Sequence, residues 1–182
     1  ISTTMPAPDF VGGGQILYDE AQMREIYEYG RGSVKVRARY TVVPGENMIE
    51  ITQIPPTTTV EAIMDKIAEL VKAGKIKEIS DMRDETDLNG LKLTLDLKRG
   101  VDADKLMAKL FKTTPLEDSF SANFNILVSG QPRVMGVREI LQEWTAFRME
   151  CVRRRTYYDL HGKEKRLHLL KGLAAILLDI DK

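Results

Sequence analysis

Residues 33–43, with the sequence SVKVRARYTVV, alternate polar and apolar side chains up to the last position. Lys35, Arg37 and Arg39 share one face with Thr41, whereas the apolar residues share the other face. A period of two is the period of a β-strand that buries one face. The stretch therefore predicts a half-buried strand. Its buried side would consist of Val34, Val36, Ala38, Tyr40 and Val42.

Further strands and helices follow at the spacing of a small mixed domain. Pro44-Gly45-Glu46-Asn47 predicts a turn, and residues 48–54 predict the second strand of a hairpin, with Ile49 and Ile51 pointing inward. The remaining patterns predict a helix over 59–73, strands over 76–81 and 91–97, a helix capped by Asp102, and a strand over 123–128. This order predicts an α+β fold, a two-layer sandwich of an antiparallel or mixed sheet with helices on one face.

The C-terminal part of the sequence predicts one long helix. From Gly136 onward there is no proline, and apolar residues such as Val137, Ile140 and Trp144 recur at steps of three and four. Such a helix is typical of a coiled coil or a connecting arm, and another segment or molecule must cover its apolar stripe. We therefore divide the chain into a linker with a short helix (1–32), an α+β subdomain (33–130) and the first strand of a coiled-coil arm (134–182).

The composition excludes several classes of protein. The chain has 182 residues, 43% of them hydrophobic, and 27 Lys and Arg against 27 Asp and Glu, so it can form a core and carries no net charge. No apolar run approaches the roughly 20 residues of a membrane span, and no leader pattern precedes the fold. The single Cys151 cannot form an internal disulfide, so we expect a reducing, cytoplasmic compartment. Because the sequence begins at Ile1 without a Met, we expect a piece of a longer protein.

The sequence contains few candidates for chemistry. It lacks a phosphate-binding glycine-rich loop, Cys and His at metal-binding spacing, and a nucleophile motif. His161 and His168 lie seven residues apart without an evident third ligand, so we interpret them as exposed helix residues rather than metal ligands. The acidic segment 81–87 could hold a cation, but Arg83 within it favours a solvated turn with local ion pairs. We predict no catalytic residue and no metal site, and interpret Cys151 as a packing residue.

The strongest evidence for a binding function is a row of cationic side chains on the first predicted strand. Lys35, Arg37 and Arg39 would project from one face about 6.5–7 Å apart, close to the spacing of successive phosphates in DNA. Arg31 could extend this row from the preceding loop. Two interpretations are open: the four residues contact a phosphate backbone, or they only solubilise an outward face. Arg153-Arg154-Arg155 is a weaker candidate, because three consecutive residues spread around a helix.

Short motifs are spread over almost the entire chain. They are Pro8-Asp9-Phe10 with Gly12-Gly13, Gly30-Arg31-Gly32 with residues 34–39, residues 83–87, Gly130-Gln131-Pro132 and Arg153-Arg154-Arg155-Thr156. Together and in this order they resemble the A subunit of bacterial type IIA topoisomerases, the DNA gyrase and topoisomerase IV family. Val11, Pro56 and segment 115–118 depart from family usage. These departures leave both gyrase and topoisomerase IV open, with a slight preference for topoisomerase IV.

The resemblance implies a role in handling DNA without catalysis. Residues up to about 130 would form most of the tower domain, and the long helix would begin the coiled coil that leads to the exit gate. The four cations would contact double-stranded DNA at the arms of the gate segment. Tyr40 lies in an Arg-Tyr-Thr triplet like that of the family's DNA-cleaving tyrosine. Because that tyrosine precedes the Pro-Asp-Phe segment in the family, we interpret Tyr40 as a core residue.

The resemblance also implies partners and cofactors. A second copy of the same polypeptide would complete the heterotetramer, an ATPase B subunit would bind ATP and Mg, and this chain itself would hold no cofactor. The first hypothesis is a non-catalytic part of an ATP-dependent double-strand-passage enzyme, which binds the arms of the gate DNA and connects to the exit gate. The alternative is a non-enzymatic adaptor domain with a dimerising helix.

Overall fold

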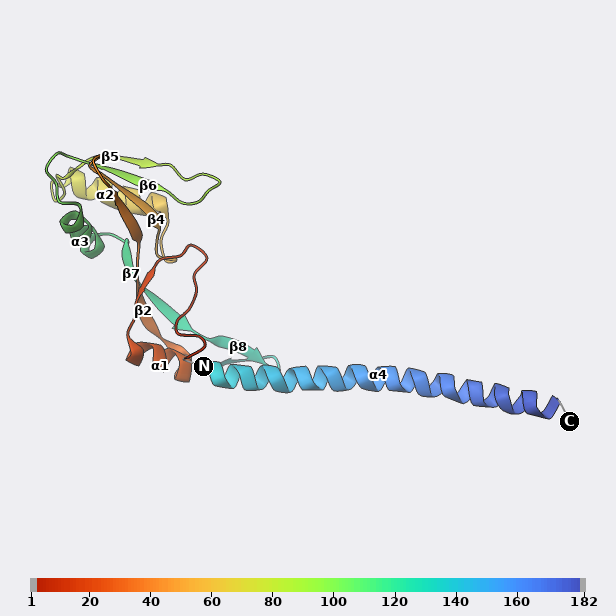
Figure 1. Cartoon of the computed structure of the whole chain (residues 1–182). Coiled ribbons are helices and arrows are strands. Elements are labelled where there is room, and N and C mark those ends of the chain that lie inside the picture. Colours follow the sequence, from red (N-terminus) through yellow and green to blue (C-terminus); the bar gives the residue numbers. More distant parts are fainter. Residues whose placement is uncertain (1–2, 181–182) are drawn as a thin grey trace.

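The computed structural model describes residues 3–180 and consists of a folded body from which one long helix extends (Figure 1). The body contains two antiparallel sheets and a small two-stranded hairpin. This architecture confirms the predicted α+β class with a long C-terminal helix. The elements are β1 (Gln15–Leu17), α1 (Glu20–Tyr29), β2 (Arg31–Arg37), β3 (Arg39–Val43), β4 (Met48–Gln53), α2 (Val60–Lys72), β5 (Ile79–Asp84), β6 (Leu93–Leu97), α3 (Ala103–Thr113), β7 (Glu117–Asn123), β8 (Asn125–Val128), β9 (Gln131–Val134) and α4 (Val137–Ile180).

The larger sheet has the strand order β3-β4-β6-β5, and its neighbouring strands are antiparallel. α2 and α3 share one core with this sheet. The core contains Ile49 and Ile51 of β4, both fully buried as predicted, together with Ile63 and Ile67 of α2. Apolar residues at steps of three and four place one stripe of α2 on the sheet. Thr59 begins this helix by accepting a hydrogen bond from a backbone N–H of its first turn.

The smaller sheet has the strand order β1-β2-β7, and α1 packs on one of its faces. Val34 and Val36 of β2 are buried in a core with Met23 and Ile26 of α1. Burial of one face sets the register of β2, because a slip by one residue would expose both valines. Figure 1 shows β2 and β7 as the narrow connection between the larger sheet and the base of α4.

The predicted single strand over 33–43 is wrong, because this stretch forms two strands that belong to different sheets. Ala38 separates β2 from β3; it is fully buried, and its backbone N–H donates to the carbonyl oxygen of Leu116 at 2.7 Å. The pairing of β3 with β4 also shifts register between Arg39 and Tyr40. Burial alternates past Ala38, with Arg39 exposed and Tyr40 half-buried, so periodicity alone does not reveal the change of sheet. Val42, predicted on the buried side, is 38% exposed, because β3 is an edge strand of its sheet.

Strand boundaries differ from prediction in the polar segments. The pattern does not predict β1, β7 or β9, and β7 forms because it pairs with β2 along its full length. β5 begins at Ile79 rather than at 76 and ends at Asp84 rather than at 81, so the first half of the predicted acidic loop lies within a strand. β8 begins at Asn125 rather than at 123. Long-range pairing, which leaves little local signal, decides these boundaries.

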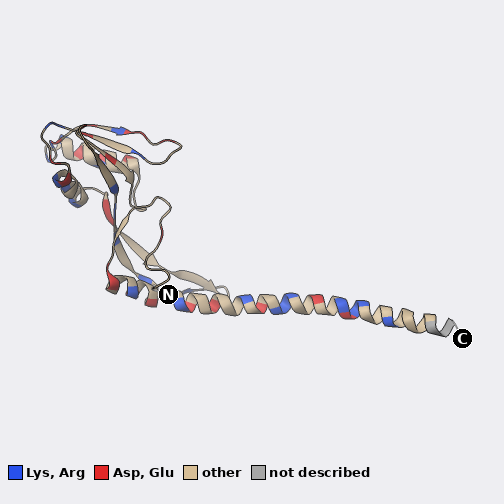
Figure 2. Ribbon diagram, viewed as in Figure 1, with Lys and Arg blue, Asp and Glu red and all other residues tan. Residues whose placement is uncertain are grey.

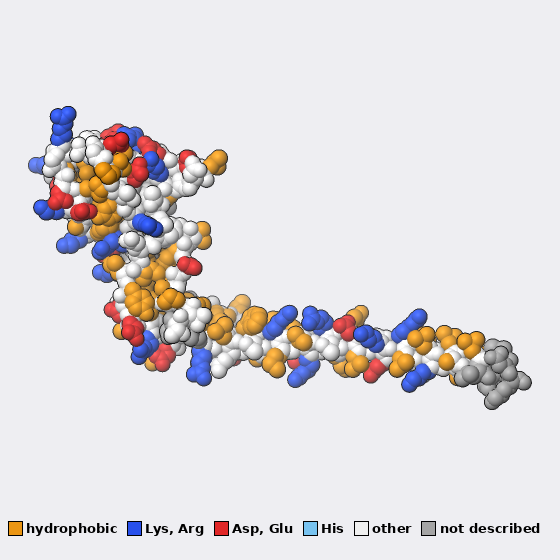
Figure 3. All heavy atoms as spheres, in the orientation of Figure 1, with side chains coloured by type: hydrophobic (Ala, Val, Ile, Leu, Met, Phe, Trp, Pro, Cys, Tyr) orange, Lys and Arg blue, Asp and Glu red, His pale blue; other side chains and the backbone are white. Residues whose placement is uncertain are grey.

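α4 confirms the predicted long helix and extends over 44 residues. Apolar side chains along it are exposed to solvent, among them Trp144 (61% exposed) and Phe147 (63% exposed). Figure 2 shows Lys and Arg interspersed with Asp and Glu along the helix, and Figure 3 shows hydrophobic side chains at its surface. Of the helices within residues 3–180, none is long and apolar enough to cross a membrane.

Candidate nucleic-acid interface

β1, β2 and β7 have a second face, opposite to the one on which α1 packs. Residues directly opposite each other in an antiparallel pair lie on the same face, so the register identifies the members of this second face. We call it the open face. It is made of Gln15, Leu17, Arg31, Ser33, Lys35, Arg37, Glu117, Ser119, Ser121 and Asn123.

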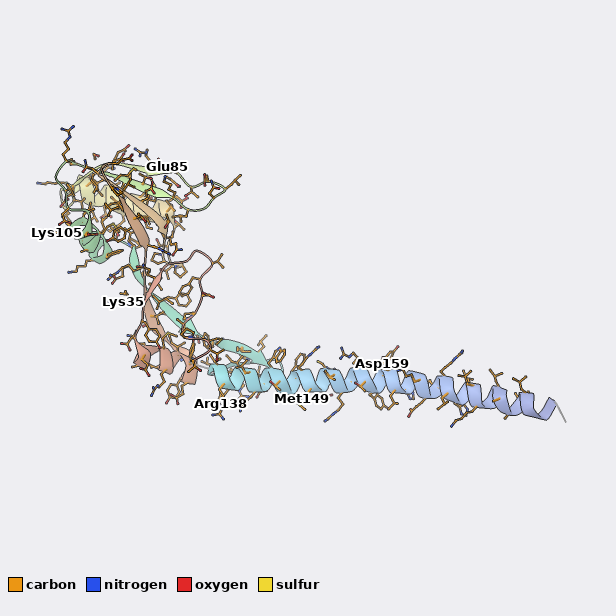
Figure 4. The ribbon with its side chains drawn as sticks, in the orientation of Figure 1. Lys35, Glu85, Lys105, Arg138, Met149 and Asp159 are labelled. Atoms are coloured by element: carbon orange, nitrogen blue, oxygen red, sulfur yellow. The ribbon has the colours of Figure 1, made fainter. Side chains whose placement is uncertain are left out.

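Three of the four predicted cations lie on the open face: Arg31, Lys35 and Arg37. Arg31 begins β2 directly after α1. Lys35 lies within β2, in the narrow part of the body between the larger sheet and the base of α4 (Figure 4). Both residues are exposed, and neither forms an ion pair with a carboxylate of residues 3–180. Their charges are therefore available to an external anion.

Arg37 has intramolecular partners. Its guanidinium forms an ion pair with Glu117, the opposite residue on β7, with a nitrogen–oxygen distance of 2.6 Å. It also lies over the ring of Phe111 in α3, at 4.6 Å from the ring centroid. A cation that is already paired and half-buried offers less charge to a phosphate than a free one. Arg37 therefore differs from Lys35, although the sequence pattern treats the two alike.

Arg39 follows Ala38, the residue at which the chain passes from the smaller sheet to the larger sheet. It is the first residue of β3, and it pairs with Gln53 of β4 rather than with β7. Its side chain is exposed and forms no ion pair with a described carboxylate. The predicted row of four cations thus consists of two unpaired cations on the open face, a paired Arg37, and Arg39 on the neighbouring sheet.

The larger sheet carries charges that neutralise one another. Arg83 pairs with Asp96 and with Glu85, the latter at 3.1 Å, and Lys92 pairs with Glu50 at 2.9 Å. Hydrogen bonds from Arg83, followed by those from Lys92 and Thr94, hold the pKa of Glu85 below its ordinary value. These contacts confirm local ion pairs in the acidic segment. Among residues 3–180, no three His, Cys, Asp or Glu side chains are grouped to hold a metal ion.

Tyr40 occupies a structural position, as predicted. Its ring is partly buried against the larger core and lies 6.0 Å from the ring of Phe111. Its hydroxyl donates a hydrogen bond to Oδ1 of Asp104 at 2.9 Å. Burial and this hydrogen bond raise the pKa of Tyr40, which disfavours the phenolate that a nucleophile needs.

The weaker candidates for metal or phosphate binding lie along the surface of α4. His161 and His168 are both exposed, and the ring of His161 stacks with that of Tyr157. Arg153 and Arg154 both pair with Glu150 of the preceding turn. Cys151 is partly buried and carries a free thiol.

Sequence reasoning missed the contribution of β7 to the open face. Ser119, Ser121 and Asn123 are exposed there, alternating with the half-buried Phe120 and Ala122. This alternation is the only local signal, and it is weak because alanine and serine are poor markers of a strand.

Comparisons with known proteins place the chain in a family. The family model that describes the A subunits of DNA gyrase and topoisomerase IV matches residues 1–182. The gyrase A subunit of Granulibacter bethesdensis is 38% identical over 185 residues, which covers 100% of this chain and 20% of that protein. The gyrase A subunit of Halalkalibacterium halodurans is 37% identical, and the match covers 98% of this chain and 22% of that protein. The chloroplastic/mitochondrial gyrase A subunit of Arabidopsis thaliana is 37% identical, and the match covers 98% of this chain and 19% of that protein.

The chain thus spans about a fifth of the length of the curated relatives it matches. All three belong to gyrases, so they lend no support to the slight preference for topoisomerase IV. The match extends over both sheets and α4, and it includes every motif on which the resemblance rests. The chain belongs to the family of DNA gyrase and topoisomerase IV A subunits.

Proposed function

We propose that this chain is the part of a type IIA topoisomerase A subunit that binds the arms of the gate DNA and connects them to the exit gate. The observation that carries the proposal is the pair of unpaired cations, Arg31 and Lys35, on an open face whose one carboxylate, Glu117, is already neutralised by Arg37. Membership of the gyrase and topoisomerase IV family supplies the expected ligand, double-stranded DNA.

The open face suits contact with a phosphate backbone rather than with base edges. Lys35 lies two strand residues from Arg37 and four from Arg31, which corresponds to about 7 and 13 Å along the strand. Contacts of this kind position a duplex without reading its sequence. Exposed Arg39 lies just past Ala38 and would continue the contact onto the larger sheet. We therefore propose Arg31, Lys35 and Arg39 as the main DNA contacts, with Arg37 as a supporting residue.

α4 would form the lever to the exit gate. Its exposed apolar side chains, such as Trp144, Phe147 and Leu173, would pack on a second helix in the complete polypeptide to form the coiled coil. In this proposal the partners are an ATPase B subunit, which binds ATP and Mg, and a second copy of the same polypeptide. The chain alone would neither cleave nor relax DNA, so a plasmid relaxation assay with the purified chain should show no activity.

Duplex binding tests the proposed contact. The affinity for a fluorescein-labelled duplex is measured by anisotropy at several salt concentrations between about 50 and 200 mM. Each phosphate contact contributes about 0.9 to the slope of log K against log salt, so the Arg31/Lys35/Arg39→Ala variant should lose about two to three units of slope. The matched control is Arg24/Lys66/Lys105→Ala, which removes three cations that already pair with carboxylates of their own helices or caps.

The control variant should bind like the unmodified chain. Equal losses in both triple variants would show that binding depends only on total charge and would contradict the proposed site. Binding that is absent or unchanged in every variant would favour the adaptor, for which the exposed apolar stripe of α4 would serve as the dimerisation surface.

A further inference from the structure

We propose that Ser119, Ser121 and Asn123 of β7 form a second row of the DNA-binding site and donate neutral hydrogen bonds to the phosphates that Arg31 and Lys35 attract. This inference rests on the proposed function, because it names further residues of the same site. β7, which the sequence pattern does not predict, would thus bind the same ligand, the phosphate backbone of double-stranded DNA.

The strand register brings each unpaired cation next to a neutral donor. Lys35 lies opposite Ser119, and Arg31 lies opposite Asn123. Directly opposite side chains in an antiparallel pair have Cβ atoms about 4.5–5.5 Å apart. A phosphate group held by the long side chain of Lys35 would therefore be within reach of a hydroxyl or amide from β7.

These donors are not engaged elsewhere in the described structure. The side chains of Ser119, Ser121 and Asn123 are exposed, and none of them forms a hydrogen bond with another residue of the described range 3–180. Thr113 and Thr114, by contrast, donate to backbone carbonyl oxygens one turn earlier, those of Lys109 and Leu110. The open face thus holds polar groups with free hydrogen-bonding capacity.

Carboxylates that would repel a phosphate are paired or lie on the other face. Asp118 pairs with Val36 in the register, so it lies on the face opposite to the donors, where it accepts a hydrogen bond from the Thr57 hydroxyl at 2.6 Å. Glu117 is on the open face, but Arg37 neutralises it. The segment from Ser119 to Asn123 therefore offers donors without a competing negative charge.

A neutral donor and a cation leave different signatures in a binding experiment. Neutralising a phosphate with a cation releases counterions, which makes binding depend on salt. A hydroxyl or amide releases none, so it contributes to affinity and position without contributing to the salt slope. This difference makes the second row measurable independently of the first.

The test compares two variants of the full chain in the duplex-binding assay. Ser119/Ser121/Asn123→Ala should weaken binding about ten- to hundred-fold at each salt concentration, because three neutral hydrogen bonds are lost, and should leave the salt slope unchanged. Ser119/Ser121→Thr keeps both hydroxyls on β-branched side chains that suit a strand, so it should bind like the unmodified chain. Gln22/Gln131/Gln142→Ala is the matched control, because it removes three exposed neutral side chains that also form no hydrogen bond within residues 3–180 and that lie outside the open face. Thermal melting of every variant reports whether the fold is retained.

The outcomes separate this inference from the proposed function. If Ser119/Ser121/Asn123→Ala binds DNA normally while Arg31/Lys35/Arg39→Ala binds weakly, the proposed role of β7 is wrong, and the proposed DNA contact of the cations is retained. If the β7 variant lowers the salt slope, its residues do not act as neutral donors and the inference is overturned. If neither variant affects binding, the proposed function itself fails.

Discussion

Arg37 and Lys35 occupy equivalent positions in the alternating pattern, yet their surroundings differ. Arg37 pairs with Glu117 and lies over Phe111, whereas Lys35 has no described ion-pair partner. Arg37→Ala should therefore lower the free energy of unfolding by about 1–2 kcal/mol while changing the salt slope of DNA binding less than Lys35→Ala does. Urea unfolding and duplex anisotropy on both variants check this. A larger salt-slope change in Arg37→Ala than in Lys35→Ala would contradict it.

Gly30 is required where α1 ends and β2 begins. Its backbone has a φ of 74°, and a Cβ at this position would collide with the backbone of Met135, just before α4. Gly30→Ala should lower the free energy of unfolding by more than about 2 kcal/mol, because backbone strain and a steric clash add. Gly45 in the β3–β4 turn is the control, since its φ is 85° but a Cβ there would meet no atom within 4 Å. Urea unfolding of Gly45→Ala should show only about 1 kcal/mol of loss.

Glu85 should make the folded state less stable at acid pH. Its pKa is lowered in the folded state from an ordinary value of 4.5, first by the hydrogen bond from Arg83. The stabilisation is therefore present above the unfolded pKa and is lost as the pH falls through the lower folded pKa. We expect Tm to decrease between about pH 5 and pH 3, and to decrease less steeply in Glu85→Gln. The turn variant Glu46→Gln, at a carboxylate without a described ion pair, should follow the unmodified chain in thermal melts.

α2 illustrates an element whose packing is readable from its sequence. Ile67 is fully buried, whereas Val71 on the same predicted apolar stripe is 39% exposed. Ile67→Ala should lower the free energy of unfolding by about 2–5 kcal/mol, because it leaves a cavity in the larger core. Val71→Ala should cost about 0.5 kcal/mol or less, since its surroundings are already open to water. Similar losses in both variants would show that the edge of the stripe is as tightly packed as its centre.

β7 illustrates the opposite case, an element that depends on its partner. Its sequence is mostly polar, and its seven residues become a strand by pairing with β2. Ser119, Ser121 and Asn123 thereby reach the same face as Arg31 and Lys35, from a position far along the chain. The candidate interface is a product of this pairing, not of a contiguous motif.

The arm and the body should differ in local stability. Contacts between α4 and the body lie at its base, near α1, and apolar side chains farther along it are exposed. Local opening costs little where few apolar contacts are lost, so amides over residues 146–171 should exchange faster than those of β2 and β6. Hydrogen exchange followed by mass spectrometry checks this at a concentration where the chain is monomeric. Strong protection along 146–171 in the monomer would contradict the expectation that another helix must cover the stripe.

The helices, the β3–β4 hairpin and the α+β class followed from the sequence, because periodicity, caps and turns act within a few residues of one another. Asp19, Thr59 and Asp102, for example, begin their helices by accepting backbone hydrogen bonds. The division of residues 33–43 between two sheets and the open face required the tertiary structure. Both depend on contacts between distant segments, such as the ion pair that joins Arg37 to Glu117 across 80 positions of the chain, and alternation along one strand carries no information about the strand that will pair with it.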